Sequence, residues 1–161
     1  MEISWIHGVL AGILGTALMT LAIVAGRLMG LATDMVRVLG LFFVPETRPK
    51  QVYALGLVVH FLFGAFFGII YAILLTVTGA AFFVGAAAAY GAVFGAAHGA
   101  ALGLALGALP AVHPRMGSGQ VLAPPGFFGR NIGLGMPVGL ILLHIVYGVA
   151  ASVFYSVSVL G

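Results

Sequence analysis

Residues 51–114 decide the class of this protein, and their sequence is QVYALGLVVHFLFGAFFGIIYAILLTVTGAAFFVGAAAAYGAVFGAAHGAALGLALGALPAVHP. None of these 64 residues is Asp, Glu, Lys or Arg. A helix that crosses the hydrocarbon core needs about 20 apolar residues, so the stretch is too long for one span and suits two. A break near Thr78 and Gly79 divides it. The short connection 78–82 then predicts an antiparallel hairpin.

Two further runs without charged residues flank this stretch, at 3–26 and at 131–161. We therefore predict four transmembrane helices, at roughly 3–29, 52–77, 82–109 and 132–158, in one integral membrane domain that covers residues 1–161. The fold class is all-α, a polytopic membrane four-helix bundle. The first run is interpreted as a retained span rather than a signal peptide, because no basic residue precedes it and its apolar stretch is too long.

The composition supports this class. The hydrophobic fraction is 63% and the charged fraction only 6%, which is far too little charge to cover the surface of a soluble domain. There is no cysteine, so disulfides and thiolate metal sites are excluded. The net charge of +3 is small and its basic residues border the predicted spans, so we expect no nucleic acid among the partners. The expected surroundings are a lipid bilayer.

The basic residues predict the orientation. All six border the first and third connections: Arg27, Arg37, Arg48 and Lys50, then Arg115 and Arg130. Basic residues favour the cytoplasmic side of a membrane. We therefore expect a multi-pass protein of the plasma or inner membrane with both termini outside.

The connection after the first span has features of a short interfacial helix. Thr33 or Asp34 can cap it, several apolar residues follow, and Pro45 and Pro49 would end it. The alternative is a simple extension of the first span. In the third connection, 110–131, Pro and Gly are frequent, and Asn131 is expected to cap the fourth span, with Met136 and Pro137 in its first turns.

Small residues form stripes at helical spacing. In the span 82–109 glycine recurs every fourth residue, and Gly8 and Gly12 in the first span continue to Thr16 and Thr20. Such stripes let helix backbones approach closely in lipid, so we expect the span 82–109 to be the most enclosed of the four. The alternative is that the missing side chains leave room for a flat cofactor. The candidate packing residues are Gly91, Gly95, Gly99, Gly103, Gly107, Gly64, Gly68 and Gly148.

An internal repeat links the second and fourth spans. Both carry His, then Gly four residues on, then a small residue, then Tyr three residues further: His60, Gly64, Gly68 and Tyr71 in one, and His144, Gly148, Ser152 and Tyr155 in the other. These positions share one helix face. The repeat indicates a duplicated helical hairpin, or two helices with similar roles across a pseudo-two-fold axis.

These segments carry a resemblance. VVHFLFGAFFGIIYAILL (58–75), LLHIVYGVAASVFY (142–155), LAGILGTALMT (10–20) and MVRVLG (35–40) resemble a family of uncharacterised small four-helix membrane proteins of bacteria and archaea. The family's third helix is bulkier, whereas here it is rich in Ala and Gly and contains His98. No activity is established for that family, so the resemblance implies architecture and topology only.

Three histidines are the candidate cofactor ligands. His60, His98 and His144 lie on three different predicted spans, at depths that differ by about 6 Å at 1.5 Å per residue. Imidazole suits haem iron, copper and zinc, so haem b is a possible cofactor. The alternatives are structural histidines that bond hydroxyls or carbonyls of neighbouring helices, or a role with protons or a quinone. His7 is expected at the membrane interface beside Trp5, and His113 in solvent.

Catalytic patterns are absent from the sequence. No predicted span contains an acidic residue, and neither a phosphate-binding loop nor an HExxH motif occurs. We therefore expect a non-enzymatic membrane protein that acts by association, as an accessory subunit of a membrane complex or as a homo-oligomer. The alternatives are a haem- or metal-binding redox protein that uses the intramembrane histidines, and a small transporter or channel.

Overall fold

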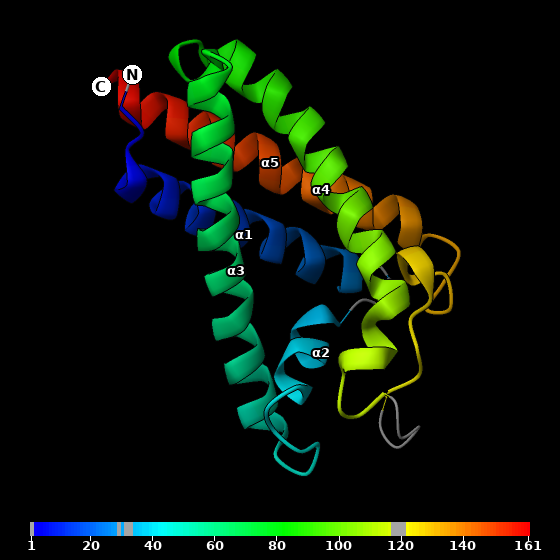
Figure 1. Ribbon diagram of the computed structural model, residues 1–161. Helices are drawn as coiled ribbons and strands as arrows, with labels where there is room; N and C mark the ends of the chain where they lie inside the picture. The colour runs from blue at the N-terminus through cyan, green and yellow to red at the C-terminus, as the bar shows by residue number, and fades with distance from the viewer. Residues whose placement is uncertain (1, 29, 31–33, 117–121) are drawn as a thin grey trace.

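The computed structural model describes residues 2–28, 30, 34–116 and 122–161. Over these residues the fold is all-α, as predicted (Figure 1). The helices are α1 (Trp5–Leu28), α2 (Met35–Leu41), α3 (Pro49–Val77), the 3-10 turn η1 (Ala80–Phe82), α4 (Val84–Val112), the 3-10 turn η2 (Phe127–Gly129) and α5 (Met136–Leu160). The helices α1, α3, α4 and α5 are each long and apolar enough to cross a membrane.

The short helix predicted after the first span is confirmed as α2. The Asp34 side chain caps it by accepting a hydrogen bond of 3.1 Å from the Arg37 backbone N–H. Thr33, the other predicted cap, lies outside the described residues. Pro49 occupies the first turn of α3, a position where its missing N–H is harmless.

Several helix ends differ from the prediction by three or four residues, and α3 begins at Pro49 rather than 52. α5 begins at Met136 rather than 132, because the chain makes turns at Gly129 (φ +70°) and beyond, and Pro137 marks the true first turn. Asn131 therefore does not cap α5, and its side-chain amide donates instead to the Pro124 carbonyl at 3.0 Å. α4 continues past Pro110 to Val112, so the proline is accommodated in its last turn.

The four long helices form an open arrangement rather than a closed ring. α1 packs against both α3 and α5, and α4 packs against α5. The turn between α3 and α4 is as tight as predicted, with Gly79 in a left-handed conformation (φ +74°). Yet the two helices contact each other little and diverge from it as a V, with α1 and α5 behind them in Figure 1. The predicted hairpin is therefore present in connectivity, and its two arms splay apart.

Glycine stripes bind the helices in pairs. A Cβ atom added at Gly12 of α1 would lie 2.2 Å from the Gly64 carbonyl oxygen of α3. A Cβ atom at Gly91 of α4 would lie 2.5 Å from the Gly148 carbonyl oxygen of α5. Each pair is therefore in backbone contact that no larger residue allows. The repeated motif supplies Gly64 in one pair and Gly148 in the other, which supports the predicted duplication.

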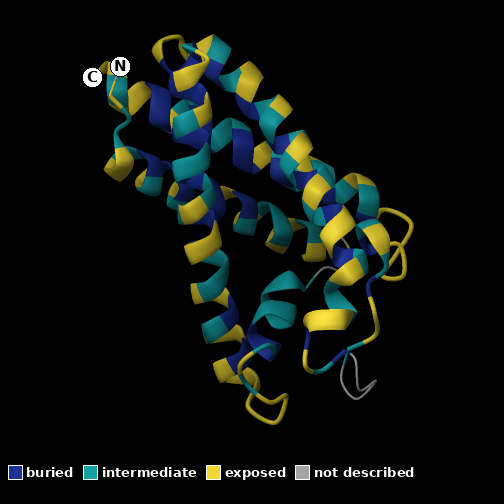
Figure 2. Ribbon diagram, in the orientation of Figure 1, coloured by how far each residue is buried: buried dark blue, intermediate teal, exposed yellow. Residues whose placement is uncertain are grey.

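α4 is not the most enclosed span, and that prediction is wrong for the described chain. The buried share of the best apolar window is 39% in α5 but only 22% in both α3 and α4 (Figure 2). The physical reason is that the α4 glycines lie on one face. Gly91, Gly95 and Gly99 meet α5, and Gly103 and Gly107 are covered by the Phe128 and Phe127 rings. The opposite face remains uncovered.

Polar contacts mark the two ends of the molecule. At one end the Ser4 backbone N–H donates to the Tyr155 hydroxyl at 3.2 Å, and the Ser156 hydroxyl donates to the Ala81 carbonyl at 2.7 Å. This gathers the two termini and the α3–α4 turn. At the other end, α2 packs on the start of α3. The chain segments that carry the six basic residues all lie at that second end, as the connectivity requires.

Candidate intramembrane binding site

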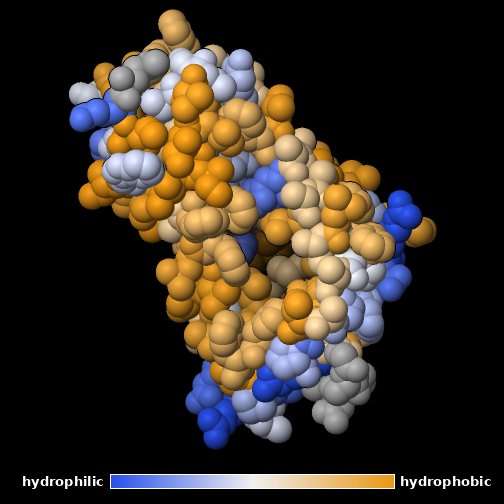
Figure 3. All heavy atoms as spheres, viewed as in Figure 1, coloured by the Kyte–Doolittle hydropathy of each residue, from blue (hydrophilic) through white to orange (hydrophobic). Residues whose placement is uncertain are grey.

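A groove of about 470 Å³ lies between the diverging helices α3 and α4. We call it the α3–α4 groove. Figure 3 shows this hollow in a surface that is mostly hydrophobic, with a few hydrophilic atoms in its walls. Its lining residues are Phe67, Ile70, Tyr71 and Leu74 of α3 and Phe94, Ala97, His98, Ala101, Leu102 and Ala105 of α4. None of them is charged, and four carry aromatic or imidazole rings.

The groove lies between the α3–α4 turn and a tether at the other end of the molecule. The His113 ring, just after α4, has its Nε2 3.1 Å from the Val38 carbonyl oxygen of α2. Its Nδ1 accepts a hydrogen bond of 3.1 Å from the Arg115 backbone N–H, and the Arg115 guanidinium donates to the Leu41 carbonyl. Since α2 packs on α3, these contacts join the diverging ends.

The prediction that His113 is solvated is therefore wrong. The residue is only 2% exposed, and its ring lies against Phe42 with ring centroids 4.1 Å apart. The sequence did contain a signal, because a histidine at a helix end followed by Pro114 and Arg115 offers several hydrogen-bonding groups in a short segment. What the sequence lacked was the position of α2.

The structure brings two of the three predicted histidines together. The rings of His98 and His144 are in contact, with centroids 4.8 Å apart, while among the described aromatic and imidazole rings His60 pairs only with Phe61. Two axial imidazoles would each need about 2 Å to an iron, so their facing nitrogens alone would be about 4 Å apart. Ring centroids lie behind the nitrogens, so the centroids of two axial rings would be about 6 Å apart, and the observed 4.8 Å is closer than that. Cofactor binding by these histidines stays a prediction.

The hydrogen bonds of the three histidines differ. His144 Nδ1 lies 2.7 Å from the carbonyl oxygen of Leu140 in its own helix, rather than from a group of a neighbouring helix. Within the described chain, His60 Nε2 and both ring nitrogens of His98 are buried without a hydrogen-bond partner. The described residues also contain no group of three or more His, Cys, Asp or Glu placed to hold a metal ion. The described residues therefore supply no hydrogen-bond partner for these three imidazole nitrogens.

Two hydroxyls share this condition: Tyr71 and Ser152 have buried oxygens with no partner among the described residues. Tyr71 is 2% exposed and lines the α3–α4 groove, with its ring centroid 6.2 Å from that of His98. An unsatisfied polar atom in hydrocarbon costs free energy. Tyr71 and His98 together place three such atoms at one groove. The sequence identifies Tyr71 as a repeat residue and as a possible hydrogen-bonding partner of the histidines, but it does not reveal the groove.

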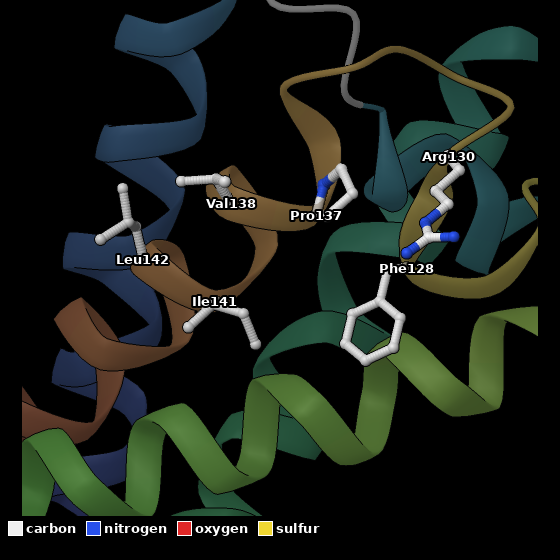
Figure 4. A pocket seen from close by; sticks show the side chains of 6 residues that line it. All are labelled: Phe128, Arg130, Pro137, Val138, Ile141 and Leu142. Carbon is white, nitrogen blue, oxygen red and sulfur yellow. The ribbon is translucent and has the colours of Figure 1, made fainter.

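A second hollow of about 410 Å³ lies beside the start of α5 (Figure 4). Its lining is Phe128, Arg130, Pro137, Val138, Ile141 and Leu142, and the close-up shows the Phe128 ring directed toward α4. This ring fills the space beside Gly103, which explains why Phe128 tolerates a left-handed backbone (φ +55°). The room that the glycines leave at this end of α4 is therefore taken by protein side chains.

Comparison with protein-family models, with curated proteins and with solved structures gives no match. No family match accompanies the resemblance noted in the sequence, and the four long apolar helices are consistent with a small four-span membrane protein. Length and composition of these helices indicate a multi-pass membrane protein in contact with the lipid bilayer.

Proposed function

We propose that this protein is a non-enzymatic membrane protein that acts by association with another transmembrane helix. The partner is either a second copy of the chain or a subunit of a larger membrane complex. The supporting observation is the uncovered side of α4. This helix is richest in Ala and Gly, yet it shares with α3 the smallest buried share of the four.

The uncovered side has residues suited to a helix–helix contact. Val93 is 65% exposed and Leu104 is 56% exposed, and Ala97 and Ala108 between and beyond them are exposed as well. We call these four residues the outer face of α4. Small side chains let a second backbone approach, and helix association in lipid depends on such packing because lipid is as apolar as leucine.

The absence of cysteine from the sequence allows a direct test. Val93→Cys is introduced and native membranes are treated with a disulfide-forming oxidant and, separately, with a thiol cross-linker. We expect a dimer-sized band for self-association or one defined heavier adduct for a partner subunit. The matched control is Leu62→Cys, which is 64% exposed on α3. Equal, weak cross-linking at both positions would contradict the proposal.

We also propose that both termini lie outside the cytoplasm. The supporting observation is that all six basic residues belong to the segments at one end of the molecule, where α1 ends and α3 begins. A reporter that is active only outside the cytoplasm, fused after Gly161, should be active. Cytoplasmic activity of the matching fusion would reverse the orientation.

A second candidate function is that of a redox protein with a haem or metal, and the observation that favours it is the contact between the His98 and His144 rings. An optical spectrum of the purified protein decides between the two functions. A Soret band at stoichiometric occupancy would establish haem binding, and metal analysis covers copper and zinc. Association alone predicts neither signal.

A further inference from the structure

We propose that the α3–α4 groove binds a lipid quinone or quinol, with Tyr71 and His98 as its hydrogen-bonding residues. The groove shares Ala97 with the outer face of α4, but Tyr71 and His98 lie outside that face, so quinone binding and helix association are tested by different variants. The inference starts from atoms that lack partners. The Tyr71 hydroxyl and both ring nitrogens of His98 are buried and unpartnered in the described structure, and both residues line the groove.

The three unpartnered atoms have almost no exposed surface, so a guest bonds them only when the Tyr71 and His98 side chains turn toward the groove, and it then needs more than one polar group. Tyr71 can donate or accept one hydrogen bond, and a neutral His98 has one donor and one acceptor nitrogen. A quinone offers two carbonyl oxygens to such donors, and a quinol adds hydroxyl donors. A sterol or a long-chain alcohol has one hydroxyl and would satisfy fewer of the three atoms.

The charge of the groove requires a neutral guest. All ten lining residues are uncharged. A fatty acid would bring a carboxylate into this site, and a metal ion would bring positive charge without an acidic ligand to balance it. A fatty acid and a metal ion are both disfavoured, because each would place an uncompensated charge in a low-dielectric site.

The walls of the groove suit a flat ring. Phe67 and His98 lie face to face at a tilt of 32°, with centroids 3.8 Å apart, and Phe94 lies beside Tyr71 at 6.1 Å. Aromatic side chains favour offset or edge contacts with another ring. The volume of about 470 Å³ is in the range typical of small-molecule sites.

The position of the groove requires a guest that arrives from the lipid. The α3–α4 turn bounds one end, and the His113 and Arg115 contacts with α2 bound the other. A membrane-spanning partner helix inserted between α3 and α4 would meet both. Ala97 and Ala101 at the side of the groove are exposed, so a lipid-soluble molecule can enter sideways from the bilayer.

The test uses the whole protein in lipid nanodiscs with decylubiquinone as the probe. Photolabelling with an azido derivative of this quinone, followed by peptide mapping, should label residues of the α3–α4 groove. Tyr71→Phe should weaken saturable labelling about tenfold, in line with the loss of one hydrogen bond to a buried ligand. It should leave the thermal stability of the empty protein unchanged, because the lost hydroxyl has no partner in the described structure.

Two further variants separate binding from folding. Ala101→Phe fills the groove from an exposed position and should abolish labelling while the protein still folds. Tyr155→Phe, which removes a hydroxyl outside the groove, should lower stability and leave labelling intact. Labelling spread evenly over lipid-facing residues, or unchanged labelling in Tyr71→Phe and Ala101→Phe, would overturn the proposal. So would displacement of the probe by a fatty acid but not by excess quinone.

Discussion

The two copies of the repeated motif have opposite surroundings. In α5, the Tyr155 hydroxyl lies 3.1 Å from the Thr76 hydroxyl and accepts from Ser4, and His144 Nδ1 contacts a carbonyl oxygen. In α3, the Tyr71 hydroxyl and His60 Nε2 are buried without partners in the described part of the chain. The α5 copy is not fully satisfied, since Ser152 Oγ also lacks a partner there. The clear contrast is between the two tyrosines.

The helices that pack on the two copies also differ at one matched position. Gly12 and Gly91 occupy equivalent places, each against the glycine that follows the histidine of one copy. Three residues further along are Gly15 in α1 and Phe94 in α4. A Cβ atom at Gly15 would lie 3.1 Å from Tyr147, so glycine lets α1 and α5 close together. Phe94 stands at the matching position of α4, its ring centroid 6.1 Å from that of Tyr71, and α4 contacts α3 little. The α5 copy of the motif is therefore packed against α1, whereas Tyr71 of the α3 copy lines the α3–α4 groove.

The largest expected effect comes from breaking a glycine contact. In Gly91→Leu, the new Cβ atom would lie 2.5 Å from the Gly148 carbonyl oxygen. Overpacking of this kind lowers the folding stability by about 3 kcal/mol or more. We expect little folded protein by size-exclusion chromatography in detergent. The control is Gly85→Leu, at a position with nothing within 4 Å. Similar yields for both variants would show that the α4–α5 contact is looser than described. By the same reasoning, Gly99→Leu should disrupt assembly far more than Leu74→Ala.

An intermediate effect is expected where His113 and Arg115 join the end of α4 to α2. His113→Ala removes a buried ring that contacts Val38, Arg115 and Phe42, and we expect a loss of about 2 kcal/mol of stability. The segment between α2 and α3 should also become more sensitive to protease. His7→Ala is the control, because among the described residues the Nδ1 of this half-buried histidine has the nearby Ser4 hydroxyl as its hydrogen-bond partner. An unchanged melting temperature and digestion pattern for His113→Ala would mean that α2 is held by α3 alone.

The smallest effects are expected from two variants that compare the two copies of the motif directly. Tyr155→Phe and Tyr71→Phe each remove the hydroxyl from the tyrosine of one copy. Tyr155→Phe should cost about 1 kcal/mol, since its hydroxyl bonds Thr76 and Ser4. Tyr71→Phe should cost close to nothing in the empty protein. Thermal unfolding of both variants, side by side in lipid-free detergent, measures the difference. Equal losses would indicate that Tyr71 has a partner after all, and the two copies would then be alike.

The sequence predicted the elements better than their arrangement. Charge-free runs and the break at Thr78 and Gly79 are local signals that located the four spans, and the Asp34 cap located α2. The start of α5 was missed because Asn131 resembles a cap, whereas its amide bonds Pro124. The burial of α4 was overestimated because a glycine stripe shows that one face is packed and gives no information about the opposite face.

The candidate site was predictable only in part. His98 and His144 were expected at similar depth, and their rings do meet. That Tyr71 lines a groove depends on the splay between α3 and α4, which no local pattern in the sequence indicates. The burial of His113 depends on α2, which precedes it by some 75 residues. Such long-range contacts leave no periodic pattern in the sequence.

The order in the chain of the residues that pack on the α4 glycines has a consequence for membrane insertion. Everything that closes its glycine row lies later in the chain: Phe127 and Phe128 cover Gly107 and Gly103, and α5 covers the rest. α4 also has the lowest mean hydropathy of the four spans. While it leaves the ribosome it is therefore the span least able to partition into lipid by itself, and its glycines have nothing to pack against. Its stable insertion should wait for α5, so that the last two spans enter the bilayer as one unit.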